Sequence, residues 1–250
     1  MSRIESYREQ LAHMQDWEAY LLRESGLPGP RSNLELMHAA ADLGSAAWFD
    51  RYLSLTPEQA PENTPEVFPL ICAVSGLGRL LVEGDLARLS QLREFASDPR
   101  WRVREAVCMG LQRWGRADMP ALLKAMQIWA QGNPMEQRAA AAALCEPDLL
   151  REEQHAGAVL DILDTITASI PARTARKAED FRVLRKGLAY CWSVAVAALP
   201  QVGMPRFEAW LSSTDADIRW VCKENLKKKR LARLDEGWVT VCISKLEENA

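Results

Sequence analysis

The segment that most constrains the fold is residues 98–115, which read DPRWRVREAVCMGLQRWG. Asp98 can accept hydrogen bonds from the free amides of a helix start, and Pro99 suits a first turn, where no N–H is needed. The pattern predicts a helix from about Arg100 that stops at Gly115. Its apolar residues recur every three or four positions and form one stripe: Val103, Ala106, Val107, Gly110, Leu111 and Trp114. One helix cannot bury such a stripe alone, so other helices must cover it.

The rest of the chain supplies such neighbours. Further amphipathic helices are predicted at residues 3–24, 33–43, 45–53, 66–82, 85–97, 117–131, 135–145, 149–169, 179–199, 202–212, 217–231 and 238–246. Gly76 and Gly78 interrupt the most apolar of these helices, where they mark close packing or a bend. Residues 56–65 contain three prolines and are predicted to form a loop. No stretch alternates as a strand does, so the chain is predicted to be all-α.

A recurring unit is visible among the predicted helices. The arginines at comparable positions of successive second helices are separated by 34, 47 and 34 residues: Arg104, Arg138, Arg185 and Arg219. Two-helix units of this length predict an α-solenoid, here of about five to six hairpins. We expect one domain over residues 1–250, with divergent helices at 1–84, clearer repeats at 85–232 and a C-terminal cap at 233–250.

The repeats carry a local pattern, an Asp-containing turn followed by Val-Arg or Ile-Arg. Its two best copies are Asp98 with Val103 and Arg104, and Asp215 or Asp217 with Ile218 and Arg219. This pattern resembles the HEAT repeat. The chain's size and basic middle look like the small bacterial HEAT-like proteins grouped around DNA alkylation-repair glycosylases. Those enzymes use a carboxylate framed by tryptophans in a concave groove, and no residues of this chain match that arrangement one by one.

Charge is unevenly distributed along the chain. The net charge of −3 combines −7 over residues 1–85, +7 over residues 86–233 and −3 over residues 234–250. Residues 223–233 hold six Lys or Arg against one Glu. A solvated helix face explains such a run, and contacts with a polyanion are the alternative. A second basic cluster precedes it: Arg173, Arg176, Lys177, Arg182, Arg185 and Lys186.

The tryptophans divide into two groups. Five fall on apolar stripes and are predicted to pack in the core: Trp48, Trp114, Trp129, Trp192 and Trp210. Trp101 and Trp220 lie among basic residues, where an aromatic ring can stack on a base while cations hold phosphates. The predicted binding residues are Trp101, Arg102, Arg104, Arg138, Arg182, Arg185, Trp220, Lys223, Lys227, Lys228 and Arg230. For the repeat arginines, ion pairs between repeats are the competing interpretation.

Signs of catalysis are few. The sequence contains no P-loop, nucleophile elbow or metal-ligand cluster, so no catalytic residue, cofactor or metal is expected. Glu179 and Asp180 are more typical of first-turn acids than of a catalytic pair. The six cysteines, without a CxxC pair, predict buried free thiols. The charged N-terminus and the lack of a long apolar run predict a cytoplasmic protein with no membrane contact.

These observations predict a non-catalytic HEAT-repeat scaffold. Its basic concave surface would bind a macromolecular partner, either protein or nucleic acid. The alternative is a DNA-binding protein or an alkylated-base DNA glycosylase.

Overall fold

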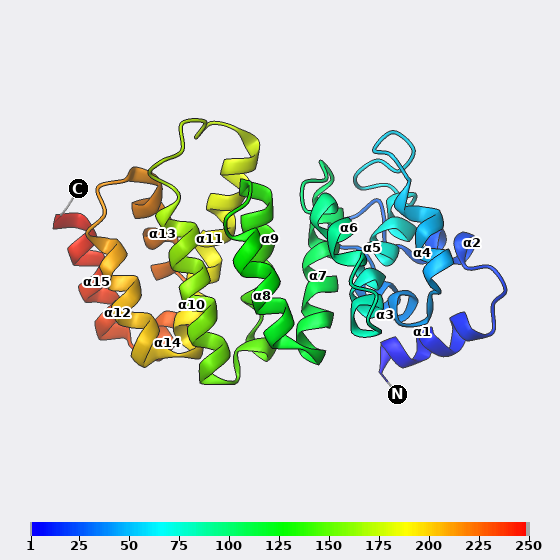
Figure 1. Cartoon of the computed structure of the whole chain (residues 1–250), viewed down its shortest axis with the longest axis horizontal. Coiled ribbons are helices and arrows are strands. Elements are labelled where there is room, and N and C mark those ends of the chain that lie inside the picture. Colours follow the sequence, from blue (N-terminus) through cyan, green and yellow to red (C-terminus); the bar gives the residue numbers. More distant parts are fainter. Residues whose placement is uncertain (1, 249–250) are drawn as a thin grey trace. The chain divides into compact units, whose positions relative to one another are not determined.

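The computed structural model describes residues 2–248, and within these residues every regular element is helical. The predicted all-α class is therefore confirmed. The chain divides into two compact units, Met1–Ala117 and Asp118–Ala250. Figure 1 shows the helices of each unit. That one continuous array spans both units stays a prediction. No helix within the described residues is both long and apolar enough to cross a membrane.

The first unit is built on four helices that pack side by side in chain order. Its helices are α1 (Arg3–Ala12), α2 (Glu18–Glu24), α3 (Leu34–Leu43), α4 (Ala46–Leu53), α5 (Val67–Val82), α6 (Arg88–Phe95) and α7 (Trp101–Ala117). The row runs α1, α3, α5, α7, and the shorter α2, α4 and α6 pack against α5 from beside it. This alternation of two layers is that of stacked helical hairpins.

The second unit repeats this plan more regularly. Its elements are α8 (Met119–Trp129), α9 (Pro134–Leu144), a 3-10 turn (Pro147–Leu150), α10 (Glu153–Ala168), α11 (Glu179–Ala198), α12 (Pro200–Leu211), α13 (Ala216–Leu226), α14 (Lys229–Leu234) and α15 (Glu236–Glu248). The hairpins α8/α9, α10/α11 and α12/α13 stack in order. We call α8, α10, α12 and α15 the first-helix layer, and α9, α11 and α13 the second-helix layer. Each layer buries its stripe against the other, as in an α-solenoid.

Side-chain caps fix where the hairpin helices begin. Asn133 accepts from the N–H of Glu136 at 2.9 Å while the Glu136 carboxylate accepts from the Asn133 N–H, and Pro134 occupies the first turn of α9. Asp215 accepts from two amides at the start of α13. These caps satisfy amides that have no partner within their own helix.

The helix of the most informative segment differs at both ends from its prediction. Asp98 accepts from the Arg100 N–H at 2.8 Å, so Arg100 still belongs to the turn and α7 begins one residue later, at Trp101. At the other end α7 continues through Gly115 to Ala117. Asp118 then caps the next helix by accepting from the N–H of Ala121. The chain therefore turns at this cap rather than at the glycine.

Glycines set the closest helix contacts of the first unit. A Cβ added at Gly78 of α5 would lie 2.0 Å from the carbonyl oxygen of Gly110 in α7. A Cβ at Gly76 would lie 2.2 Å from the ring of Phe49 on α4. Both glycines thus mark close packing, one against α7 and one against α4.

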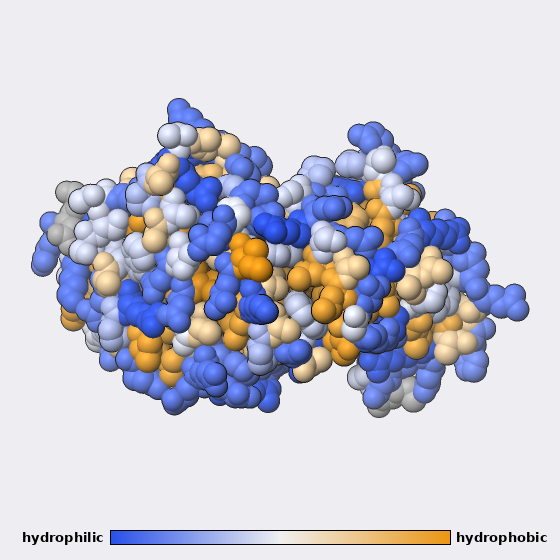
Figure 2. Space-filling view, viewed as in Figure 1, coloured by the Kyte–Doolittle hydropathy of each residue, from blue (hydrophilic) through white to orange (hydrophobic). Residues whose placement is uncertain are grey.

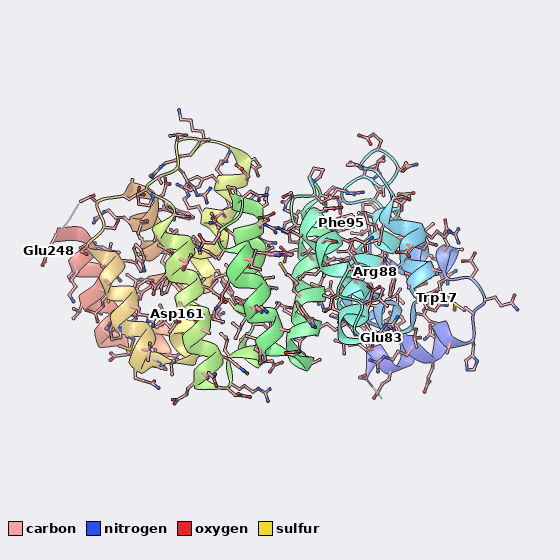
Figure 3. All side chains as sticks on the ribbon, viewed as in Figure 1. Trp17, Glu83, Arg88, Phe95, Asp161 and Glu248 are labelled. Carbon is pink, nitrogen blue, oxygen red and sulfur yellow. The ribbon has the colours of Figure 1, made fainter. Side chains whose placement is uncertain are left out.

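Two predicted helices are interrupted. The segment predicted as one helix at residues 3–24 breaks between α1 and α2, where the Trp17 indole N–H (Figure 3) donates to the Leu11 carbonyl at 2.9 Å. The helix predicted at 217–231 ends at Leu226, and Lys228 is extended. A continuous helix would have turned Lys229 toward the core; the break instead lets Leu231 of α14 be fully buried.

Candidate binding surface

The predicted arginines of α7 lie inside the first unit. Arg102 forms an ion pair with Glu62 and donates to the Gly29 carbonyl at 2.7 Å and to Asn63 Oδ1 at 3.1 Å. It is buried and connects loops that are far apart in sequence. Trp101 beside it is half exposed, with the Arg102 guanidinium 5.4 Å from its ring centre. Arg102 therefore already has partners within the fold, and its role in binding stays a prediction.

Arg104 is also a structural residue in this unit. Its guanidinium donates to the main-chain carbonyls of Asp98 at 2.7 Å and Pro99 at 2.9 Å, and it is buried. The Asp98 carboxylate pairs with Arg100 at 2.7 Å rather than with a neighbouring repeat. Asp98 and Arg104 thus both make contacts within their own turn.

The other eight predicted residues all belong to the second-helix layer of the second unit or to the segment that follows it. They are Arg138 on α9, Arg182 and Arg185 on α11, Trp220 and Lys223 on α13, Lys227 and Lys228 after α13, and Arg230 on α14. Arg138 of α9 packs closely against α11, because a Cβ added at Gly187 would lie 3.3 Å from Arg138 Cγ. Arg185 of α11 covers the ring of Trp220 on α13. We call these eight residues, with Lys186 and Tyr190, the basic surface.

Tyr190 is a member of this surface that the sequence did not reveal. Its side chain is 47% exposed. Arg230 lies 4.6 Å from the ring centre and donates to the hydroxyl, and the Lys228 ammonium lies 5.8 Å from the same ring centre. Tyr190 follows Arg182 and Lys186 at four-residue steps along α11, so helical spacing was the signal that could have found it. The result is an exposed aromatic ring with two cations near it.

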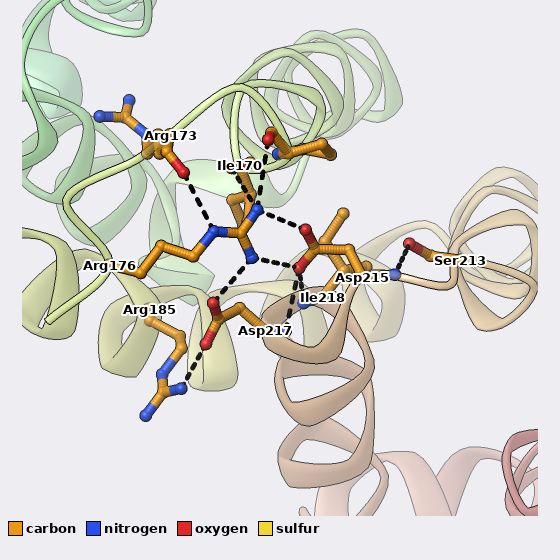
Figure 4. A network of polar contacts seen from close by, with 9 residues as sticks. Ile170, Arg173, Arg176, Arg185, Ser213, Asp215, Asp217 and Ile218 are labelled. Atoms are coloured by element: carbon orange, nitrogen blue, oxygen red, sulfur yellow. Dashed lines mark hydrogen bonds and ion pairs between the residues drawn. The ribbon is translucent and has the colours of Figure 1, made fainter. Parts of the chain in front are cut away.

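A half-buried ion-pair network includes the arginine that covers Trp220. Arg185 lies 4.3 Å from the Trp220 ring centre and pairs with Asp217. Asp217 also accepts from Arg176 at 2.9 Å, and Arg176 pairs with Asp215 at 2.6 Å (Figure 4). The Arg176 guanidinium holds the pKa of Asp215 below its usual value. Ion pairs thus connect the α10–α11 loop and α11 to the start of α13, as expected for Asp and Arg between repeats.

An apolar groove borders the basic surface. It has a volume of about 410 Å³ and lies between α13 and α15. Its lining residues are Arg219, Trp220, Lys223, Leu226, Lys227, Ile243, Leu246 and Glu247. Arg219 donates to the Leu246 carbonyl, which fixes α15 against α13. Three predicted binding residues, all on or just after α13, therefore line one groove.

A larger cavity, of about 610 Å³, lies within the first unit. Its arginines already have partners: Arg8 and Arg113 both pair with Asp42, and Arg79 donates to two main-chain carbonyls at the end of α3. Burial and the nearby Arg113 lower the pKa of His38 in its wall. These contacts give Arg8, Arg79 and Arg113 partners within the fold.

Candidate catalytic carboxylates lie apart from the basic surface or at helix starts. Glu179 and Asp180 occupy the first turn of α11, as helix-dipole acids do. Asp164 accepts from the Trp210 indole N–H at 2.7 Å and from Arg206, and burial raises its pKa. It lies on α10, in the first-helix layer, one turn from Asp161 (Figure 3).

The cysteines and the core tryptophans behave largely as expected. All six cysteines are free and buried. No cluster of three metal-ligating side chains occurs in the part of the chain that the structure describes. Trp114, Trp129 and Trp192 are buried, while Trp48 and Trp210 are only partly so. On the face drawn in Figure 2, hydrophilic residues cover most of the second unit.

The stacked hairpins define a helical-repeat protein. No protein-family model and no curated protein matches the chain. Among solved structures, an engineered protein matches at 15% identity and a TM-score of 0.31, covering 88% of this chain and 98% of its own. A designed armadillo repeat protein matches at 12% identity and a TM-score of 0.31, covering 83% and 98%.

Proposed function

We propose that this helical-repeat chain is a non-catalytic binding protein of the HEAT type whose basic surface binds a polyanionic macromolecule. The observation that carries the proposal is the convergence of cations around two aromatic rings. Arg185 stacks on Trp220, and Lys228 and Arg230 flank the exposed Tyr190. Cations at a ring face are worth about 0.5–1 kcal/mol each at exposed sites, and they attract anionic groups to the same place.

Several acids pair with members of this surface, and Asp217 pairs with Arg185. Glu179 lies 3.8 Å from Arg182 and Glu224 lies 2.5 Å from Lys227. Lys186 and Lys223 are exposed and form no ion pair within residues 2–248. The surface therefore keeps a positive charge although the whole chain is acidic. An acidic protein segment is the first partner that fits such a surface.

Single-stranded DNA is the second candidate, and Tyr190 is the observation that favours it. An exposed ring between two cations can stack a base while the cations contact phosphates. The DNA-binding and alkylated-base glycosylase alternative rests on this geometry and on the resemblance to HEAT-like alkylation-repair proteins. A glycosylase would also need a shielded carboxylate beside the flipped base. The carboxylate that lies next to this surface, Asp217, is already paired with Arg185 and Arg176.

The proposal is tested by anisotropy with fluorescent poly-glutamate and a single-stranded oligonucleotide. If about six phosphates are contacted, the affinity for DNA falls about a thousandfold between 50 and 200 mM salt. The double variant Lys186→Glu/Lys223→Glu is expected to weaken binding of either polyanion at least tenfold. The control Lys124→Glu/Arg151→Glu reverses as many exposed charges outside the surface and is expected to change little.

The outcomes separate the candidates. Absence of binding to both polyanions at 50 mM salt would refute the proposal, as would equal losses in the two double variants. Binding of poly-glutamate alone would exclude the DNA alternative. Binding of DNA without release of alkylated bases would exclude only the glycosylase.

A further inference from the structure

Among residues 118–248, the second-helix layer contains one helix fewer than the first-helix layer. The first-helix layer contains α8, α10, α12 and α15, whereas the second-helix layer contains α9, α11 and α13. The short α14 packs mainly against α11 and α15 and does not extend the second-helix layer beside α13. In a helical-repeat stack each helix covers the stripe of the one before it. The place beside α13 where the next second-layer helix would lie is the α13–α15 groove.

The floor of this groove is apolar. Leu226 from α13 and Ile243 and Leu246 from α15 line it, next to the Trp220 ring. Ile243 is 42% exposed although it lies on a helix whose neighbouring turns are packed. The volume of about 410 Å³ falls in the range of roughly 300–1,000 Å³ that is typical of ligand pockets. An occupant with large aliphatic or aromatic side chains would bury this floor.

The rim of the groove is basic. Arg219, Lys223 and Lys227 line it together with one acid, Glu247, and Lys227 also pairs with Glu224 outside the lining. Lys223 is exposed and has no ion-pair partner within the described chain. An occupant that carries acidic residues on either side of its apolar face would complement both the rim and the floor.

We propose that the α13–α15 groove binds an acidic amphipathic helix of a partner protein, which lies beside α13 in the groove that α13 and α15 form. This rests on the proposed function and names the partner of the same surface. An amphipathic helix in a groove between two helices is an established mode of peptide recognition. A nucleic-acid base fits less well, because its polar edges need hydrogen-bonding groups that Leu226, Ile243 and Leu246 cannot supply.

The test uses an end-blocked, fluorescent peptide of about 16 residues in which Leu recurs at three- and four-residue spacing between Glu residues. A scrambled peptide has the same charge but no apolar stripe. We expect the full chain to bind the amphipathic peptide at least tenfold more tightly than the scrambled one. Ile243→Gln is expected to remove most of this preference. Val241→Gln is the matched control, because Val241 is exposed on the same helix but does not line the groove.

Neither substitution changes charge, so both variants should still bind poly-glutamate as the wild type does. Poly-glutamate binding by these variants therefore distinguishes a failure of the groove proposal from a failure of the proposed polyanion binding. Circular dichroism melting of both variants confirms that they fold. Equal affinity for the two peptides, or a change below twofold in Ile243→Gln, would overturn the proposal even if polyanion binding persists. Two further results would overturn it: Ile243-dependent binding of an oligonucleotide or of anionic vesicles, and a concentration-dependent dimer that Ile243→Gln abolishes.

Discussion

The contact between α5 and α7 gives the sharpest stability prediction. A Cβ at Gly78 would lie 2.0 Å from the carbonyl oxygen of Gly110, 2.6 Å from its carbonyl carbon and 2.7 Å from its Cα. All three are main-chain atoms of α7, so no side chain can rotate away. Reaching an ordinary contact of 3.4 Å requires the nearest pair of atoms to separate by about 1.4 Å. Gly78→Ala therefore has to push two buried helices apart.

The expected cost follows from two opposing effects. Overpacking a well-packed core costs about 1–3 kcal/mol, and a main-chain collision lies at the upper end of that range. Alanine in place of a helical glycine returns about 1 kcal/mol. Gly78→Ala should therefore lower the free energy of unfolding by about 2 kcal/mol. At Gly110 a Cβ would lie 3.2 Å from the Val74 carbonyl oxygen, so small shifts suffice and the two effects nearly cancel.

Urea unfolding followed by circular dichroism measures both variants, and hydrogen exchange of α5 and α7 localises the loss. Gly157→Ala serves as a positive control, because its Cβ would meet only a Leu199 methyl carbon, at 3.9 Å. It should stabilise the chain by about 0.5–1 kcal/mol. If Gly78→Ala is as stable as the wild type, or if Gly110→Ala loses as much, the argument from main-chain contact is refuted.

Three further predictions concern the second unit. Arg176→Gln should lower the free energy of unfolding by about 2 kcal/mol at pH 7. Because Arg176 lowers the pKa of Asp215 in the folded state, the difference in stability between the variant and the wild type should shrink as pH falls below 3.8. Urea unfolding at several pH values measures this, and a difference that does not change with pH would contradict the prediction. Burial raises the pKa of the Cys222 thiol to about 12, so a thiol reagent at pH 8 should label Cys222 only after unfolding. Labelling of Cys222 in the native chain would contradict this prediction. Asn225→Leu should cost about 2–4 kcal/mol in urea unfolding, since fully buried Asn225 accepts from the Ser193 N–H at 2.8 Å; a smaller cost than Ser193→Ala would argue against it.

Helical periodicity and cap chemistry were enough to predict most of the fold, because both act over a few residues. The stripe of α7 is buried as predicted, and Asn133 and Asp215 cap the helices they precede. The break at Lys228 could not be predicted from the basic run around it. It depends on Leu231 finding a buried place against α11 and α15, which is a contact between distant parts of the chain.

The hydrogen-bond acceptors near each arginine determine whether its guanidinium binds the fold or stays available to a partner. Arg104 and Arg219 occupy the same position of the repeat pattern, yet Arg104 donates to carbonyls of its own turn and Arg219 to a carbonyl at the end of α15. A planar guanidinium with five donors satisfies several main-chain carbonyls at once, whereas an ammonium on a flexible stem remains solvated. Arg104 and Arg219 therefore bind main-chain carbonyls of the fold, while Lys186 and Lys223 are exposed. The proposed binding site is accordingly placed at exposed lysines next to an apolar groove and not at Arg104 or Arg219.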